Sequence, residues 1–229
     1  MDSDLSFSLP DTVPGMTLPE VVLFPQATMP LYIFEPRYRK MLEDILDGNR
    51  LMVIATQDKE RSQSEDLFEA YHPQATLGLV QSSQKNPDGT SSILVQGLLR
   101  VNAETTCQEE PYRIFAINPL ESEAGDTSEN LEKHANKLSA LIQRRSELGN
   151  NLSREILRFF ESIDDPEILA DLVSFTLINN TASKLELLSA LKVTQRFEIL
   201  FEHLTEEIKH LELISKLKGK LDNERIDWN

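Results

Sequence analysis

The sequence has little that would place the protein in a membrane or in an oxidising compartment. It contains one cysteine, so no intrachain disulfide can form. No apolar run approaches the roughly 20 residues that a membrane-spanning helix needs. The N-terminus is acidic and lacks the basic start of a secretory signal peptide. We therefore expect a cytoplasmic protein.

Basic residues are also scarce. The chain has 23 Lys and Arg residues against 38 Asp and Glu residues, a net charge of −15. Residues 1–120 hold 9 basic and 17 acidic groups, and residues 121–229 hold 14 and 21, so neither half conceals a basic arm. This deficit argues against a protein that follows nucleic-acid phosphates and against adhesion to an anionic membrane.

Motifs for catalysis are missing as well. A phosphate-binding loop needs Gly-x4-Gly-Lys-Ser/Thr, whereas Lys218–Lys220 is followed by Leu221. Cys107 has no recognisable His and Asn partners for a nucleophilic role. His203 and His210 share a helix face with acidic residues but lack the His-Glu-x-x-His form, which favours a solvated surface. The sequence therefore predicts no catalytic residue, no metal and no cofactor.

The spacing of the apolar residues differs between the two halves of the chain. Short apolar runs bounded by turn residues predict strands at 21–24, 52–55, 77–80, 92–95 and 114–117. Asn86–Gly89 carries the Pro-Asp-Gly signal of a tight turn, so the strand at 77–82 should pair with the strand at 91–97. A single helix is expected at Arg37–Leu46. Closely spaced strands with one helix indicate a small barrel or a folded-over sheet over residues 17–119.

The rest of the chain has helical periodicity. We expect a flexible tail at 1–16, a polar linker at 120–130 and a helical region at 131–229, which makes the fold class α+β. Asp165 before Pro166 predicts a helix start, and Ser183 with Glu186 has the form of a capping box. The last helix should run from Thr194 to about Leu221, about 40 Å at 1.5 Å per residue, long enough to project or to pack on a partner.

One string is more specific than any of these patterns. Pro30–Tyr38 reads Pro-Leu-Tyr-Ile-Phe-Glu-Pro-Arg-Tyr, and Leu23-Phe24-Pro25 precedes it. Matching pieces continue to about residue 217, among them 77–78, 87–90, 165–173, 184–188, 196–198 and 206–213. This series resembles the Lon protease substrate-binding (N-terminal) domain family. The resemblance implies a PUA-like β-barrel lobe followed by an α-helical bundle lobe with a long final helix. Full Lon proteases continue into ATPase and peptidase domains, so we expect a stand-alone, non-catalytic binding module.

The resemblance suggests binding of unfolded or flexible polypeptide segments. We expect an apolar groove between the barrel and the helices, with exposed strand edges that can accept a peptide strand. The candidate peptide-binding residues are Leu23, Phe24, Phe34, Glu35, Arg37 and Tyr38.

A purely architectural role for the same string is the alternative interpretation. Pro36 would then start the helix, Glu35 would favour its positive end, and Phe34 and Tyr38 would fill the core. We also expect an ion pair between Glu35 and Arg100 across the barrel.

Two further functions compete with this hypothesis. One is an adaptor or regulator of a separate ATP-dependent protease of the Lon type. The other is a PUA-like RNA or small-molecule module, which the acidity of both halves disfavours. The charge of −15 favours basic client segments. The apolar stripe of the last helix also permits a homodimer.

Overall fold

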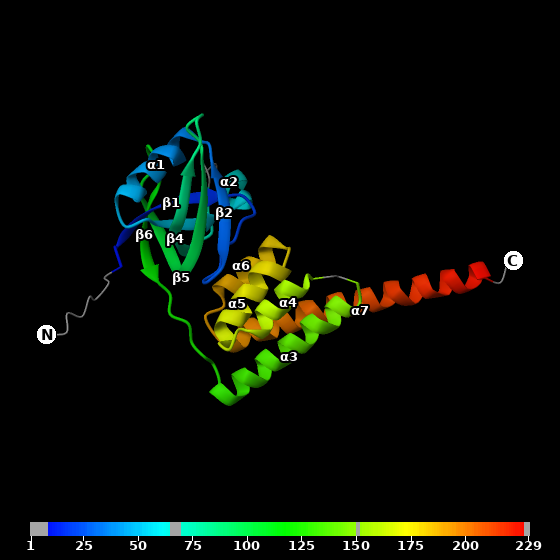
Figure 1. Ribbon diagram of the computed structural model, residues 1–229. Helices are drawn as coiled ribbons and strands as arrows, with labels where there is room; N and C mark the ends of the chain where they lie inside the picture. Colours follow the sequence, from blue (N-terminus) through cyan, green and yellow to red (C-terminus); the bar gives the residue numbers. More distant parts are fainter. Residues whose placement is uncertain (1–8, 65–69, 150–151, 227–229) are drawn as a thin grey trace. The chain divides into compact units, whose positions relative to one another are not determined.

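The computed structural model describes residues 9–64, 70–149 and 152–226. They fall into two compact units, one ending at Glu121 and the next beginning at Ser122. The first unit holds the sheet and two helices, and the second holds five helices within these ranges (Figure 1). The α+β class is therefore confirmed. None of the described helices combines the length and apolar character that spanning a bilayer requires.

The six strands of the first unit form one sheet. They are β1 (Thr12–Leu18), β2 (Thr28–Ile33), β3 (Leu51–Thr56), β4 (Gln74–Lys85), β5 (Ser91–Gln108) and β6 (Ile114–Pro119). The strand order is β2-β5-β4-β3-β1-β6, and β6 returns to pair with the second half of β5. The sheet thus folds over on itself, but β2 remains an edge strand on the first half of β5. Of the two expected forms, a small barrel or a folded-over sheet, the structure shows the folded-over sheet.

The core of this unit lies inside the folded sheet. All six residues of β3 are buried, and β3 lies inside the sheet between β1, to which it is parallel, and β4, to which it is antiparallel. Phe115 lies fully buried among aliphatic side chains, and the Tyr71 ring meets it edge-on with centroids 5.1 Å apart. The expected hairpin is confirmed, because β4 pairs with β5 on either side of the Asn86–Gly89 turn.

Two helices accompany the sheet. Helix α1 (Pro36–Asp47) starts at the predicted proline and buries one face, which consists of Tyr38, Met41, Leu42 and Ile45. Helix α2 (Lys59–Ser64) is short. The helix predicted at Arg37–Leu46 is therefore confirmed.

The expectation of a single helix in this unit is wrong, because α2 is a second one, and two more expectations for the unit are wrong. Residues 12–16 are not part of a tail, because they belong to β1 and Val13 is in the core; residues 1–8 lie outside the described residues. The apolar run at 21–24 forms no strand. Hydroxyl groups satisfy its backbone in place of a strand partner, since Thr56 Oγ1 donates to the Val21 carbonyl at 2.6 Å. Thr76 Oγ1 donates to the Leu23 carbonyl at 2.6 Å.

The second unit is helical throughout. Its helices are α3 (Ser128–Glu147), α4 (Arg154–Glu161), α5 (Pro166–Leu177), α6 (Thr181–Ser189) and α7 (Val193–Ile226). Asp165 caps α5 as predicted, its carboxylate accepting from the amides of Glu167 and Ile168 at 2.8 and 3.2 Å. The prediction of a capping box at Ser183 is wrong. Helix α6 begins at Thr181, and Asn180 Oδ1 accepts from the Ser183 amide at 3.1 Å.

The long helix α7 packs its first half against α3 and α5. Phe197, Leu200 and Leu204 are fully buried there. Two ion pairs join α7 to α3: Arg144 Nη2 to Glu212 Oε1 at 2.8 Å, and Arg145 Nε to Glu207 Oε2 at 2.7 Å. Arg145 is buried.

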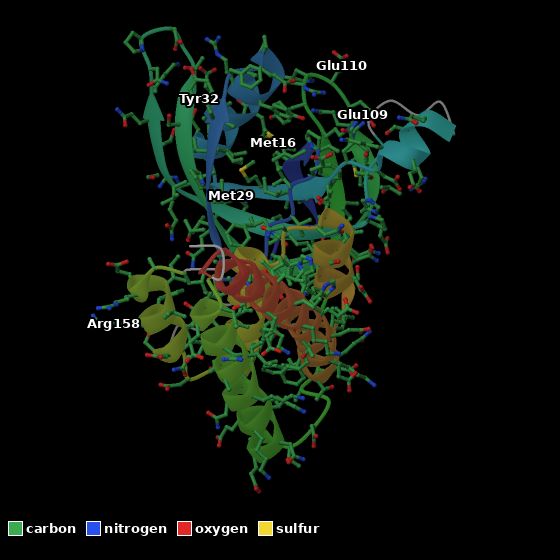
Figure 2. The ribbon with its side chains drawn as sticks, turned by 90° about the vertical axis from the view of Figure 1, so that its right-hand side faces the viewer. Met16, Met29, Tyr32, Glu109, Glu110 and Arg158 are labelled. Atoms are coloured by element: carbon green, nitrogen blue, oxygen red, sulfur yellow. The ribbon has the colours of Figure 1, made fainter. Side chains whose placement is uncertain are left out.

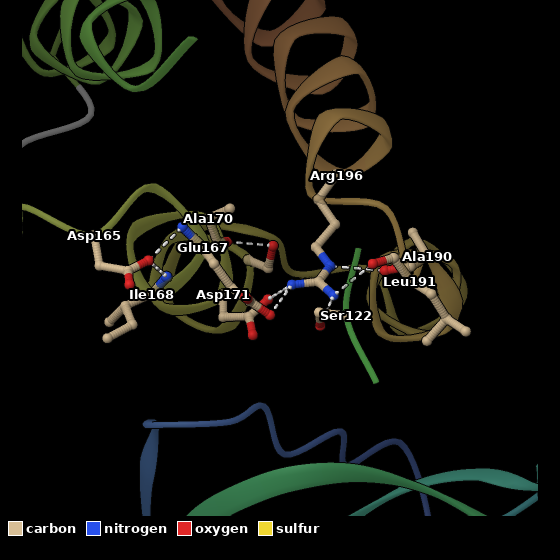
Figure 3. Close-up of polar contacts among 10 residues, drawn as sticks. Ser122, Asp165, Glu167, Ile168, Ala170, Asp171, Ala190, Leu191 and Arg196 are labelled. Atoms are coloured by element: carbon tan, nitrogen blue, oxygen red, sulfur yellow. Dashed lines mark hydrogen bonds and ion pairs between the residues drawn. The ribbon is translucent and has the colours of Figure 1, made fainter. Parts of the chain in front are cut away.

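Arg196, near the start of α7, is the largest fully buried side chain of the described residues. Its Nη1 meets Glu167 Oε1 at 3.0 Å and Asp171 Oδ1 at 3.3 Å. Its Nε donates to the Ala190 carbonyl at 2.7 Å, and its Nη2 to Ser122 Oγ at 2.6 Å (Figure 3). One guanidinium therefore ties α5, the end of α6 and the first residue of this unit to α7.

Candidate functional site

The Pro30–Tyr38 string joins β2 to α1. Glu35 occupies the N-cap position in an extended conformation (φ −66°, ψ 135°), although its side chain makes no capping hydrogen bond. Pro36 then supplies the φ angle that the first helical turn needs. Tyr38 lies on the buried face of α1, as the architectural interpretation expects. Phe34 does not fill the core, because 59% of it is exposed.

Leu23 and Phe24 cannot take part in a peptide surface. They are 1% and 0% exposed. The loop that carries them is fixed to the sheet, because the amide of Gln26 donates to the Gly97 carbonyl at 2.8 Å and the Gly97 amide donates to the Ala27 carbonyl at 2.8 Å. Both residues belong to the core, and their inclusion among the candidate peptide contacts is corrected accordingly.

The prediction of an ion pair between Glu35 and Arg100 is also wrong. Glu35 Oε2 instead accepts from Arg37 Nε at 3.0 Å. Register explains the difference: Ile33, two residues before Glu35, pairs with Ser91 at the start of β5. Arg100 lies nine residues further along β5, about 30 Å at 3.3 Å per residue. Its buried guanidinium faces the Phe24 ring, with Cζ 6.0 Å from the ring centroid.

Arg37 is held from both sides. Besides its contact with Glu35, its Cζ lies 4.6 Å from the centroid of the Tyr38 ring. About a third of the Arg37 side chain is exposed. The guanidinium is therefore partly accessible to a bound chain, and its carboxylate and aromatic neighbours fix its position.

An exposed aromatic pair precedes this junction. The rings of Tyr32 and Phe34 stack with centroids 6.3 Å apart and an interplanar angle of 24°. Tyr32 is 54% exposed. Met29 and Tyr32, both labelled on β2 in Figure 2, lie on opposite sides of the strand, because Met29 is buried. Sequence reasoning missed Tyr32, although the alternation of a strand places residues 32 and 34 on the same side.

A hydrogen-bond network holds the Tyr32 ring. Its hydroxyl donates to Thr90 Oγ1 at 2.8 Å, and Thr90 Oγ1 donates to Asp88 Oδ1 at 2.6 Å. Asn86 Nδ2 also donates to Thr90 Oγ1, at 2.9 Å. The bonds from Thr90 hold the pKa of the Asp88 carboxyl below its usual range. The β4–β5 turn thus fixes an aromatic ring that water still reaches.

The stacked rings of Tyr32 and Phe34 are suited to contact with another chain. Exposed aromatic rings offer apolar area and a polar rim to a bound chain. Within the described ranges, no three His, Cys, Asp or Glu side chains gather closely enough to hold a metal ion. Cys107 is exposed and carries a free thiol.

The helical unit has a separate pocket of about 370 Å³. It lies beside the start of α5 and is lined in part by Glu132, Asp164 and Glu167. The buried guanidinium of Arg196 forms an ion pair with the Glu167 carboxylate. The charged residues that line the pocket are all acidic, whereas the aromatic pair on β2 is uncharged.

Comparison with known proteins identifies relatives over most of the chain. Residues 12–206 match the family described as the ATP-dependent protease La (LON) substrate-binding domain. The chain is similar to the Lon protease of Dictyoglomus thermophilum, 28% identical over 218 residues, which are 94% of this chain and 27% of that protein. It is also similar to the Lon protease of Desulfosudis oleivorans, at 26% identity over 93% of this chain and 26% of that protein. The chain thus spans about a quarter of the length of these relatives.

Solved structures show the same fold. The N-terminal domain of a Mycobacterium avium complex Lon protease superposes with a TM-score of 0.65 at 16% identity, covering 85% of this chain and 98% of that one. A Lon N-terminal domain protein from Xanthomonas campestris gives a TM-score of 0.61 at 16% identity, over 83% and 97% of the two chains. At this identity the likeness concerns the fold alone.

Proposed function

The chain belongs to the LON substrate-binding domain family, and from this premise we propose that it binds unfolded or flexible segments of other polypeptides through apolar contact. A family of substrate-binding domains within proteases has proteins as its natural ligands. Unfolded chains differ from folded ones chiefly in the apolar side chains and backbone that they expose. A binding module for them needs an exposed apolar surface of its own.

The observation that supports this proposal is the stacked pair Tyr32 and Phe34. Both rings are more than half exposed, and the bond from Tyr32 to Thr90 limits the freedom that would be lost on binding. Arg37, close by in sequence, offers donors that can orient a bound segment. The net charge of −15 draws basic segments toward the protein, which makes binding dependent on salt.

The direct test compares one polypeptide in two states. Hen lysozyme, which is basic, is reduced and alkylated with iodoacetamide so that it stays unfolded without added charge. We expect the protein to bind the unfolded form and to leave native lysozyme unbound, as measured by isothermal titration calorimetry. Affinity should fall as salt is raised. Equal binding of both forms, or of neither, contradicts the proposal.

A second candidate function is that of an adaptor or regulator for a separate Lon-type protease. The observation that favours it is that the matched relatives are Lon proteases of which this chain spans about a quarter. Such an adaptor would change the rate at which a purified Lon protease degrades casein, whereas an independent binding module would change it only by competing for casein. Co-purification with the protease in the absence of casein distinguishes the two.

A second copy of the chain is a further partner that we propose. Leu213 and Leu217, one turn apart on the outer side of α7, are exposed. Lys209 and Lys216 share their face with Glu206, so two antiparallel α7 helices would bring lysines of one copy near glutamates of the other. Sedimentation equilibrium of the protein and of L213E/L217E tests this, with loss of the dimer expected in the variant.

A further inference from the structure

Where β2 pairs with residues 91–96 of β5, the residues that point outward include no charged side chain. Side chains alternate across a strand, and burial shows which ones point outward. The residues that point outward form three cross-strand pairs: Tyr32 with Ser92, Pro30 with Leu94, and Thr28 with Gln96. All of these residues are uncharged, in a chain with 27% charged residues. Depletion of charge is typical of the centre of a protein interface.

Amide groups extend this face without adding charge. Gln81 Nε2 on β4 donates to Gln96 Oε1 at 2.6 Å, and Gln96 Nε2 approaches Gln26 Oε1 at 3.4 Å. Amide side chains can both donate and accept hydrogen bonds. They can therefore satisfy the backbone of a bound segment, whereas they offer no counter-charge to an acidic or basic side chain. We call the residues of the three pairs, together with Phe34 and Gln81, the β2–β5 face.

The edge of β2 is poorly suited to accept another strand. Among the described residues, β5 is the only strand paired with β2. Pro30 lies in the middle of β2, and proline is tolerated in an edge strand when its nitrogen faces away from the neighbouring strand. The outer edge then exposes the backbone groups of Thr28, Pro30 and Tyr32, and its central residue has no N–H to donate. An added strand would lose its middle hydrogen bond.

We infer that the β2–β5 face binds extended polypeptide segments that lack charged side chains, by side-chain and amide contact across the face and not by adding a strand to β2. The inference rests on the proposed function and specifies its site and the chemistry of its ligand. Basic residues elsewhere in a client assist its approach, while the segment in contact with the face is uncharged. Burying an unpaired charge against this face would be costly, which makes charge the feature that excludes a segment.

The test uses a fluorescently labelled 15-residue peptide composed of Leu, Phe, Ser and Gln, and a matched peptide in which three Ser residues are Asp. Fluorescence anisotropy measures binding to the full chain. We expect the uncharged peptide to bind at least about tenfold more tightly than the Asp peptide. The variants Y32S/F34S and S92E should each weaken the uncharged peptide by about tenfold. The variant F159S, which removes an exposed ring from α4, is the control and should bind as the unaltered protein does.

The outcomes distinguish a failure of the proposed binding site from a failure of the proposed function. Circular dichroism and urea unfolding establish that the variants are folded, and S92E changes an exposed serine that packs in no core. If unfolded lysozyme and the peptide bind the protein but Y32S/F34S and S92E bind equally well, the site inference fails and the proposed function stands. If P30A strengthens binding tenfold, the peptide adds to the strand edge and the inference also fails. If neither ligand binds the unaltered protein, both fail.

Discussion

The guanidinium of Arg196 meets the carboxylate of Asp171 inside the helical unit, with Nη1 3.3 Å from Oδ1 and side chains that are 0% and 2% exposed. Removing charges from water is costly, so such a pair is stable only when the remaining donors and acceptors are satisfied. Here the other nitrogens of Arg196 bind backbone carbonyls and Ser122. The pair thus fixes how α7 starts relative to α5.

Truncating this arginine should be among the most damaging changes in the second unit. We expect R196A to lower the free energy of unfolding by about 3–5 kcal/mol, because the buried carboxylate of Asp171 loses the guanidinium that pairs with it. R144A, which breaks a half-exposed pair with Glu212, should cost less than about 1 kcal/mol. Urea unfolding followed by circular dichroism measures both. A loss for R196A no larger than that for R144A contradicts the argument.

Gly97 is expected to tolerate no side chain. A Cβ at this position would overlap the carbonyl oxygen of Phe24, which the loop hydrogen bonds hold in place. We expect G97A to destabilise the first unit by about 1–3 kcal/mol. Gly48 is the control for steric overlap: a Cβ there meets its nearest atoms at 3.6 and 3.7 Å, so G48A should cost less than G97A. Differential scanning calorimetry compares the two variants.

Local signals in the sequence predicted those elements that local chemistry determines. The Pro-Asp-Gly turn specified the β4–β5 hairpin, because these residues favour a tight turn wherever they lie between apolar runs. Asp165 and Pro166 specified the start of α5 for a similar reason. The string at Pro30–Tyr38 gave both the start of α1 and the family.

Features that depend on long-range packing could not be predicted in this way. The run Val21–Phe24 looks like a strand, but threonine hydroxyls 35 and 53 residues away satisfy its carbonyls. The Glu35–Arg100 pair failed because the register of β2 on β5 is invisible in the sequence. Tyr32 escaped notice because its exposure depends on β2 being an edge strand on β5.

The pairing of Glu35 with Arg37, and not with Arg100 as predicted, can be measured as a coupling energy. A double-mutant cycle with E35Q and R37M should give a coupling energy between zero and about 1 kcal/mol, since both side chains are about a third exposed. The same cycle with E35Q and R100M should give no coupling within about 0.3–0.5 kcal/mol, as expected for distant sites. Urea unfolding supplies the free energies. Strong coupling between residues 35 and 100 would contradict the observed register.

Stability should fall at high pH through Tyr112. Burial and the hydrogen bond to Asp44, at 2.7 Å, raise the pKa of Tyr112 from 10 to about 12. The folded state therefore keeps the phenol proton more tightly than the unfolded state does, so the stabilisation is complete below pH 10 and is lost as the pH rises toward 12.

Comparison with Y112F isolates this effect. Lys40 bonds to the same carboxylate and loses its own proton at high pH, but it does so in both proteins. We expect urea midpoints to fall more steeply between pH 9 and 11.5 for the unaltered protein than for Y112F. Parallel midpoints over this range would show that Tyr112 is not shielded in the folded state.

Two phenylalanines ten residues apart should separate packing from binding. Phe24 is fully buried, so F24A removes a ring from a filled space and should cost about 3–5 kcal/mol. Phe34 is 59% exposed, so F34A should change the free energy of unfolding by less than about 1 kcal/mol. Polypeptide binding should respond in the opposite order: F34A weakens it while leaving the fold intact, and F24A affects it only through the fraction of protein that unfolds. Binding measured at a temperature where F24A is still fully folded makes this distinction, because any direct loss of affinity in F24A there would place its ring at the surface.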